Sequence, residues 1–243
     1  MGGTSEARGL AERLAPDGRF EAMLSFAGRT SSLADPGVPY RVGGFGGVGG
    51  LCEHLRRAGY RALVDATHPF AAQMSRHAAR AAELLALPLV RLEEPPWQPM
   101  SGDRWLEVST LAEAAAALGP VPRRVLSTVG RLEVGAFSAA PWHEYLLRAV
   151  DPFEPPLPRA AITRARGPFR VEDERALLER ERIEVVVSKN SGTRSTYAKI
   201  VAARELAIPV VMVRRPSLPE VTRVPGVASA LAWLEAVHGA SRT

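Results

Sequence analysis

ALVDATHPF, at residues 62–70, combines a short apolar segment, a polar turn and the beginning of a helix. A buried strand is expected for Ala62–Asp65, and an alanine-rich helix for about Phe70–Ala86, where Pro88 follows. The same order of strand, turn and helix recurs along the chain, which is typical of a parallel sheet covered by helices on both faces. We therefore predict an α/β protein.

The same alternation extends in both directions from this stretch. Further strands are expected at Phe20–Ser25, Pro39–Val42, Leu89–Leu92, Arg124–Ser127, Glu144–Val150, Ala161–Arg164, Glu184–Val187 and Ile208–Val213. Further helices are expected at Ser5–Leu14, from after Gly50 to about Ala58, and at Leu111–Leu118, Val171–Glu181, Ser195–Leu206 and Val227–Val237. The proline-rich residues 93–104 are typical of a connection between lobes. We predict two Rossmann-like lobes, residues 1–95 and 105–243, with a cleft between them.

Composition excludes several classes of protein. The 243 residues are 46% hydrophobic and 23% charged, which excludes a disordered chain. Apolar runs such as Ile208–Val213 are far shorter than the roughly 20 residues that cross a bilayer. With one cysteine, Cys52, and no histidines at metal-ligand spacing, neither a disulfide nor a metal site is expected. The chain is therefore expected to be a cytoplasmic protein without a membrane partner.

The formal net charge of +5 favours anionic ligands, although a solvated basic surface would show the same excess. The basic residues are 29 arginines and only two lysines, Lys189 and Lys199, which lie close together. A chain that uses arginine nearly everywhere can keep lysine where a compact, deformable ammonium is required, although chance clustering is the alternative. The two lysines are therefore candidates for special positions.

A glycine-rich turn precedes the first expected helix, where Gly2, Gly3 and Thr4 stand before Ser5. Glycine lets a backbone approach a phosphate, and the free N–H groups at a helix start favour negative charge. We predict that Gly3, Thr4 and Ser5 bind the pyrophosphate of a dinucleotide, although an ordinary helix entry has similar residues. Because such a turn normally follows a buried strand, we expect the natural start to lie upstream of Met1.

Ser25, Arg29 and Thr30 follow the next expected strand. In dinucleotide folds this strand end meets the adenosine ribose, where an acidic side chain selects a free 2′-hydroxyl. Hydroxyls and a guanidinium suit a 2′-phosphate instead, so NADPH is predicted rather than NADH. A polar surface turn is the alternative interpretation.

Residues 43–50 include six glycines, and so much backbone freedom costs entropy on folding. A ligand lying against the main chain would explain them, so Gly44, Gly46 and Gly47 are predicted to contact the cofactor. A flexible loop without a ligand is the alternative.

Two further strand ends have polar side chains. Thr67 is expected to cap the following helix, with Pro69 at its first position, which leaves Asp65 and His68 for a functional role. In the second lobe the polar segment SKNSG, residues 188–192, again stands between a strand and a helix, where an anion site is expected. Upstream of it, Arg164 and Arg166 add guanidinium groups.

Four motifs together resemble the precorrin-6A reductase family. They are GGTSEA at residues 2–7, DATHPFA at 65–71, RGPF at 166–169 and SKNSG at 188–192, the last followed by Ala198 and Lys199. The resemblance extends over nearly the whole chain, and it implies NADPH-dependent reduction of one double bond of precorrin-6A or cobalt-precorrin-6A in cobalamin biosynthesis. The sequence departs from the family where no apolar strand precedes Gly2 and where Thr193 follows the SKNSG motif.

This resemblance suggests a role for each candidate residue. The first lobe is expected to bind NADPH, with Asp65, Thr67 and His68 near the nicotinamide. The second is expected to bind the carboxylates of the tetrapyrrole through Arg164, Arg166, Lys189, Ser191 and Gly192. Asp65, His68 and Lys189 are the catalytic candidates, and the proton donor stays open between His68, Lys189 and water.

Two other functions remain open on sequence alone. One is an NADPH reductase of another polycarboxylate. The other is a non-catalytic, arginine-rich protein that binds a nucleotide or a nucleic acid. Because the chain has no helix-turn-helix spacing, zinc ligands or aromatic-basic segment, no nucleic-acid partner is expected. A monomer or a small homo-oligomer is expected.

Overall fold

The computed structural model describes residues 1–27 and 35–240, so Arg29 and Thr30 lie outside the described residues. The chain divides into two compact units, Met1–Pro95 together with the residues from Pro216 onward, and Pro96–Arg215. All strand pairs of the named sheets are parallel, which confirms the predicted α/β fold. Within the described ranges, no helix combines the length and the apolar character needed to cross a bilayer.

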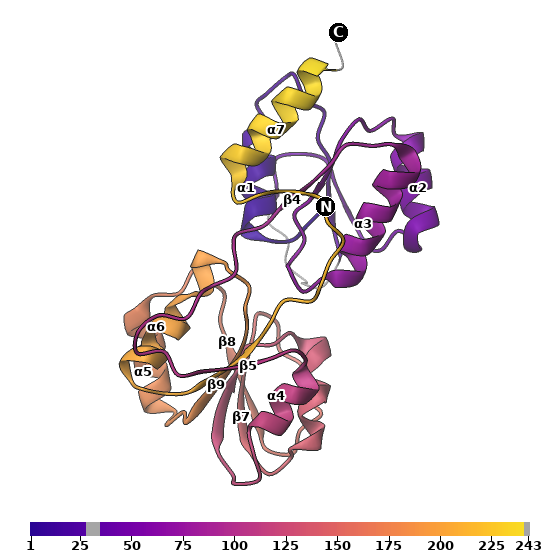
Figure 1. Ribbon diagram of the computed structural model, residues 1–243. Helices are drawn as coiled ribbons and strands as arrows, with labels where there is room; N and C mark the ends of the chain where they lie inside the picture. Colours follow the sequence, from indigo (N-terminus) through magenta and orange to yellow (C-terminus); the bar gives the residue numbers. More distant parts are fainter. Residues whose placement is uncertain (28–34, 241–243) are drawn as a thin grey trace. The chain divides into compact units, whose positions relative to one another are not determined.

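The first unit is built on short parallel strands (Figure 1). They are β1 (Leu24–Phe26), β2 (Tyr40–Val42), β3 (Leu63–Asp65), β4 (Leu89–Leu92) and β11 (Thr222–Val224), paired as β1–β2, β3–β4 and β4–β11. Met1 and Gly2 lie between β1 and β3. The Gly2 amide donates to the Ser25 carbonyl over 3.0 Å, and the Ala66 amide donates to the Met1 carbonyl over 2.8 Å. The order is therefore β2, β1, Met1–Gly2, β3, β4, β11.

Helices cover both faces of this sheet (Figure 1). On one face α1 (Ser5–Leu14) contacts α7 (Val227–Ala240), and their apolar side chains pack with Leu24, Phe26 and Leu92. On the other, α2 (Gly47–Arg57) contacts α3 (Ala72–Leu85) around Leu63. The bounds of α1 are those predicted from the sequence.

The structure differs from the predicted lobes for the residues from Pro216 onward, which we expected in the second lobe. Here β11 pairs with β4, and α7 packs on α1, so this segment returns to the first unit. The chain therefore crosses between the units twice, once near Pro95 and once near Pro216.

The second unit contains a six-stranded parallel sheet in the order β5-β10-β9-β6-β7-β8. Its strands are β5 (Trp105–Val108), β6 (Arg124–Ser127), β7 (Glu144–Ala149), β8 (Ala160–Arg164), β9 (Val185–Lys189) and β10 (Val210–Val213). The helix α4 (Leu111–Ala117) contacts the 3-10 helix η1 (Arg131–Ala139), and α5 (Val171–Arg180) contacts α6 (Ala198–Glu205), which follows the short η2 (Arg194–Thr196). In Figure 1, α4 lies on the opposite side of the sheet from α5 and α6.

Candidate functional site

In each unit some of the candidate groups lie where the strand order reverses at the carboxyl edge of the sheet, which is the usual ligand position in open parallel sheets. In the first unit the chain leaves Gly2 toward α1 and β1, and leaves β3 toward α3 and β4 on the other side. In the second unit it leaves β6 toward β7, and leaves β9 toward β10 on the other side.

The glycine turn of the first unit occupies its reversal point. A Cβ on Gly2 would collide with the Ala66 carbonyl oxygen and would lie 2.7 Å from the Ala7 Cβ, so only glycine fits there. Thr4 donates to the Ala66 carbonyl over 3.0 Å and caps α1 by accepting from the Ala7 amide over 3.1 Å. Ser5 is the exposed first residue of that helix. The predicted pyrophosphate residues Gly3, Thr4 and Ser5 thus lie together at a capped helix start.

Arg41, which the sequence did not single out, lies beside Ser25. Its guanidinium donates to the Ser25 Oγ over 3.2 Å and to the carbonyls of Gly43 and Gly44 over 2.9 and 3.0 Å. It also lies 4.0 Å from the centre of the Phe45 ring. Arg41 therefore fixes the start of the glycine-rich segment at the ends of β1 and β2.

The glycine-rich segment is only partly a loop. Gly46 is the left-handed residue before α2, and Gly47 is the first residue of that helix. A Cβ on Gly50 would collide with the Phe45 carbonyl oxygen, so close packing of the helix start explains this glycine. Contact of Gly44, Gly46 and Gly47 with a cofactor stays a prediction.

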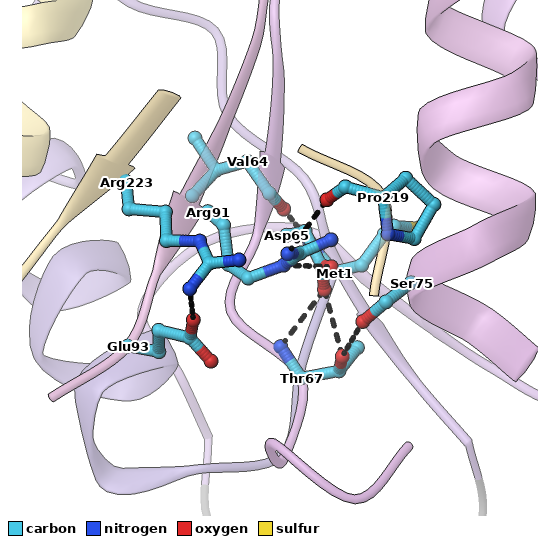
Figure 2. A network of polar contacts seen from close by, with 9 residues as sticks. All are labelled: Met1, Val64, Asp65, Thr67, Ser75, Arg91, Glu93, Pro219 and Arg223. Atoms are coloured by element: carbon cyan, nitrogen blue, oxygen red, sulfur yellow. Dashed lines mark hydrogen bonds and ion pairs between the residues drawn. The ribbon is translucent and has the colours of Figure 1, made fainter. Parts of the chain in front are cut away.

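Asp65 is a buried member of a polar network (Figure 2), with 1% of its side chain exposed. Its Oδ2 accepts from the Arg91 Nε over 3.3 Å, and Arg91 is 3% exposed and also donates to the Pro219 carbonyl. The Asp65 Oδ1 accepts from the amide and the Oγ1 of Thr67 over 3.2 and 2.7 Å. The carboxylate thus neutralises Arg91 and orients Thr67, which is a structural role; the catalytic role expected for Asp65 stays a prediction.

The turn after β3 also differs from expectation. The helix α3 begins at Ala72, so neither Thr67 nor Pro69 starts it. Thr67 donates to Asp65, and the His68 carbonyl accepts from the Ala71 amide over 2.7 Å, which forms a separate turn before the helix. His68 is exposed, and its Nδ1 accepts from the Phe70 amide over 3.2 Å. His68 is therefore the accessible titratable side chain of this turn.

At the reversal point of the second unit, Lys189 at the end of β9 forms an ion pair with Glu133 on η1, over 2.6 Å. Glu133 also accepts from the Gly130 amide over 3.0 Å. The two side chains are 14% and 29% exposed, so the pair is partly shielded from solvent. Glu133 is a polar partner that the sequence did not indicate.

The other predicted substrate residues lie along the same carboxyl edge. Ser191 and Gly192 follow β9 and are buried, whereas Arg164 and Arg166 lie at and after the end of β8 and are exposed. Strands β9 and β8 are separated by β6 and β7, so these groups span about 14 Å at the usual strand spacing.

Asn190 and Arg215 anchor the two connecting segments within the second unit. The Asn190 side chain accepts from the Trp97 amide over 2.7 Å and donates to its carbonyl over 2.9 Å. Arg215 donates to the carbonyls of Asn190 and Ser191 over 3.0 and 2.7 Å. Asn190 thus has a structural role at the first position of the candidate anion loop, residues 190–196.

The fold and the strand-end groups together define an α/β protein of parallel sheets, with a glycine turn at a capped helix start in one unit and a row of polar and basic side chains at the carboxyl edge of the sheet in the other. The family described as precorrin-6x reductase CbiJ/CobK matches residues 1–235, and the chain belongs to this family. This confirms the resemblance seen in the four motifs.

Individual relatives agree with this assignment. The precorrin-6A reductase of Rhodobacter capsulatus is 47% identical, over 99% of this chain and 96% of that protein. The cobalt-precorrin-6A reductase of Priestia megaterium is 32% identical, over 69% of this chain and 70% of that protein. A solved structure of CobK precorrin-6A reductase is 46% identical, with a TM-score of 0.92 over 97% of this chain and 94% of that chain.

Proposed function

We propose that this protein is an NADPH-dependent reductase that saturates one double bond of precorrin-6A in cobalamin biosynthesis. The observation that carries the proposal is the 46% identity and TM-score of 0.92 to CobK precorrin-6A reductase over nearly the full length of both chains. We propose the cobalt-free substrate, because identity is higher to a relative named for precorrin-6A than to one named for cobalt-precorrin-6A.

The first unit fits a dinucleotide. The Gly2 backbone lies so close to Ala66 that a Cβ has no space there. The capped start of α1 offers N–H groups to a pyrophosphate. Ser25 and Arg41 place a hydroxyl and a positive charge at the end of β1, which suits a 2′-phosphate. NADPH supplies a hydride when it is bound there.

The chain's own residues orient the reactants and bind their charges. Asp65, held by Arg91, fixes the Thr67 hydroxyl at the end of β3, and His68 on the same turn is accessible to hold or donate a proton. In the second unit, Lys189, Ser191, Arg164 and Arg166 bind acetate and propionate groups along the carboxyl edge. The polyanionic character of a precorrin matches this basic edge.

Anaerobic incubation of the purified protein with precorrin-6A tests the proposal. We expect one NADPH oxidised per precorrin reduced, followed by the nicotinamide absorbance, and much slower turnover with NADH or with cobalt-precorrin-6A. Lys189→Met should raise the KM for precorrin-6A about tenfold, because charge-assisted bonds contribute about 1.5–3 kcal/mol. The exposed Arg180, paired with Glu181, offers a matched control, and Arg180→Met should leave the KM unchanged. A folded protein that oxidises no NADPH with precorrin-6A would refute the proposal.

A further inference from the structure

Lys199 is a buried lysine that the proposed reaction does not use. It lies in the first turn of α6 and is 5% exposed. Its Nζ donates to the Thr196 carbonyl over 2.7 Å and lies 5.0 Å from the centre of the Trp97 ring. Both contacts are with uncharged groups, so neither neutralises an ammonium.

The charges around Lys199 do not balance. On the neighbouring elements, Arg148 of β7 and Glu174 of α5 form a buried ion pair of 2.9 Å, and Arg148 also lies over the Phe169 ring. Glu174 is thus already paired, and in the described part of the chain no carboxylate lies within ion-pairing distance of Lys199. The other charged side chains of α5 are exposed, and η2 contributes the Thr196 carbonyl. A protonated Lys199 therefore makes two buried cations for one buried anion.

This imbalance affects the protonation of the amine. Burial, and then the positive charge of Arg148, lower the pKa of Lys199 to about 7, while Glu174 opposes the shift. The start of α6 adds a positive helix end, which also disfavours an ammonium. Arginine could not respond in this way, because its guanidinium does not lose its proton in proteins.

The candidate anion loop lies directly beside this amine. The loop, residues 190–196, contains Thr196, whose carbonyl binds Lys199 and whose Oγ1 lies 3.4 Å from the Ser191 Oγ. Ser191 and Gly192 are buried, and Gly192 has a φ of 74° that favours glycine. An anion bound by this loop would supply the negative charge that the cluster lacks.

We propose that Lys199 takes up a proton from solvent when a carboxylate of the tetrapyrrole binds at the 190–196 loop, so that the bound anion and the buried ammonium form together. Lys199 is then a positioning residue whose charge appears only with ligand. The inference rests on the proposed function for the identity of the ligand and on this cluster for the proton uptake.

The presence of only two lysines makes the test direct. Protein labelled with ¹³C at the lysine ε-carbon should give two signals, assigned with Lys189→Met and Lys199→Met. In the free protein we expect the Lys199 signal to titrate near pH 7. Saturation with uroporphyrin, a stable tetrapyrrole with acetate and propionate groups, should raise the Lys199 midpoint by about one pH unit or more.

Calorimetry supplies a second readout. Uroporphyrin binding near pH 8 should take up protons, seen as a dependence of the heat on the ionisation enthalpy of the buffer, and Lys199→Met should abolish the uptake. A Lys199 midpoint above 9 in the free protein, or one that saturating ligand leaves unmoved, would overturn the inference. If precorrin-6A is turned over while the midpoint does not move, only this inference fails. If the midpoint moves but no NADPH is oxidised, only the proposed function fails.

Discussion

Replacing Asp65 with asparagine separates a structural role from a catalytic one. Asn keeps an oxygen that can accept from Thr67, but it removes the charge that faces Arg91 across 3.3 Å. The Arg91 guanidinium would then be buried and unneutralised, since its other partner is the Pro219 carbonyl and its Nη2 has no hydrogen-bond partner within residues 1–27 and 35–240. Because arginine does not deprotonate, the cost appears as lost stability.

Removing one partner of a buried ion pair costs about 3–5 kcal/mol. At about 4 °C per kcal/mol for a unit of this size, Asp65→Asn should lower the Tm of the first unit by about 10–20 °C. Arg91→Met should be similarly harmful, and the double variant should be more stable than the sum of the two single effects implies, because it leaves no unpaired charge.

Differential scanning calorimetry and urea unfolding provide the measurement. Glu83 and Arg80 form an exposed pair of 2.7 Å on α3, so Glu83→Gln is a matched control that should cost about 0.5 kcal/mol or less. The structural role of Asp65 is refuted if Asp65→Asn stays within about 1 kcal/mol of the unaltered protein. Loss of NADPH oxidation without loss of stability would instead restore Asp65 as a catalytic group.

Three further substitutions test other parts of the structure. Gly2→Ala should weaken NADPH binding about tenfold or more, because its Cβ collides with the Ala66 carbonyl, whereas Gly18→Ala, with open space around it, should not alter a fluorescence titration. Arg41→Ala should raise the Kd for NADPH about tenfold and that for NADH much less, and equal effects on both would contradict a 2′-phosphate site. For Lys199, whose pKa falls from 10.5 to about 7 on folding, the unfolded chain binds more protons between these two pH values. The contribution of Lys199 to the free energy of unfolding therefore rises with pH across this window, by a few kcal/mol relative to Lys199→Met. If urea unfolding gives the same difference in free energy between the unaltered protein and Lys199→Met at every pH, the burial effect is contradicted.

Local sequence signals predicted most elements well. The bounds of α1, β4 and β6 are as expected, because apolar periodicity and turn residues mark them within the segment itself. The three-residue β11 and the edge strand β5 were not predicted, because their exposed, mixed side chains lack a clear period. The start of α2 was also missed, since Gly47, Gly49 and Gly50 are poor helix formers whose helical conformation depends on packing against Phe45.

For the candidate site too, some features were predictable from the sequence and others were not. The sequence alone predicted a phosphate turn at Gly2–Thr4, because glycines stand directly before an expected helix, and an anion segment at residues 188–192, because polar residues stand there between an apolar strand and a helix. The sequence also showed that lysine is rare and confined to Lys189 and Lys199. Those features, with the two motifs at residues 65–71 and 166–169, were sufficient to indicate the family.

Only the tertiary structure decided which charges neutralise one another. The register of β3 and β4 places Asp65 opposite Arg91, and the order of the second sheet brings Glu133 to Lys189 from 56 residues away. The same packing leaves Lys199 buried, with no acidic partner among the residues that the structure describes. A strand can take its neighbour from any part of the chain, so the partners of a buried charge depend on sheet order and register, which no local segment contains.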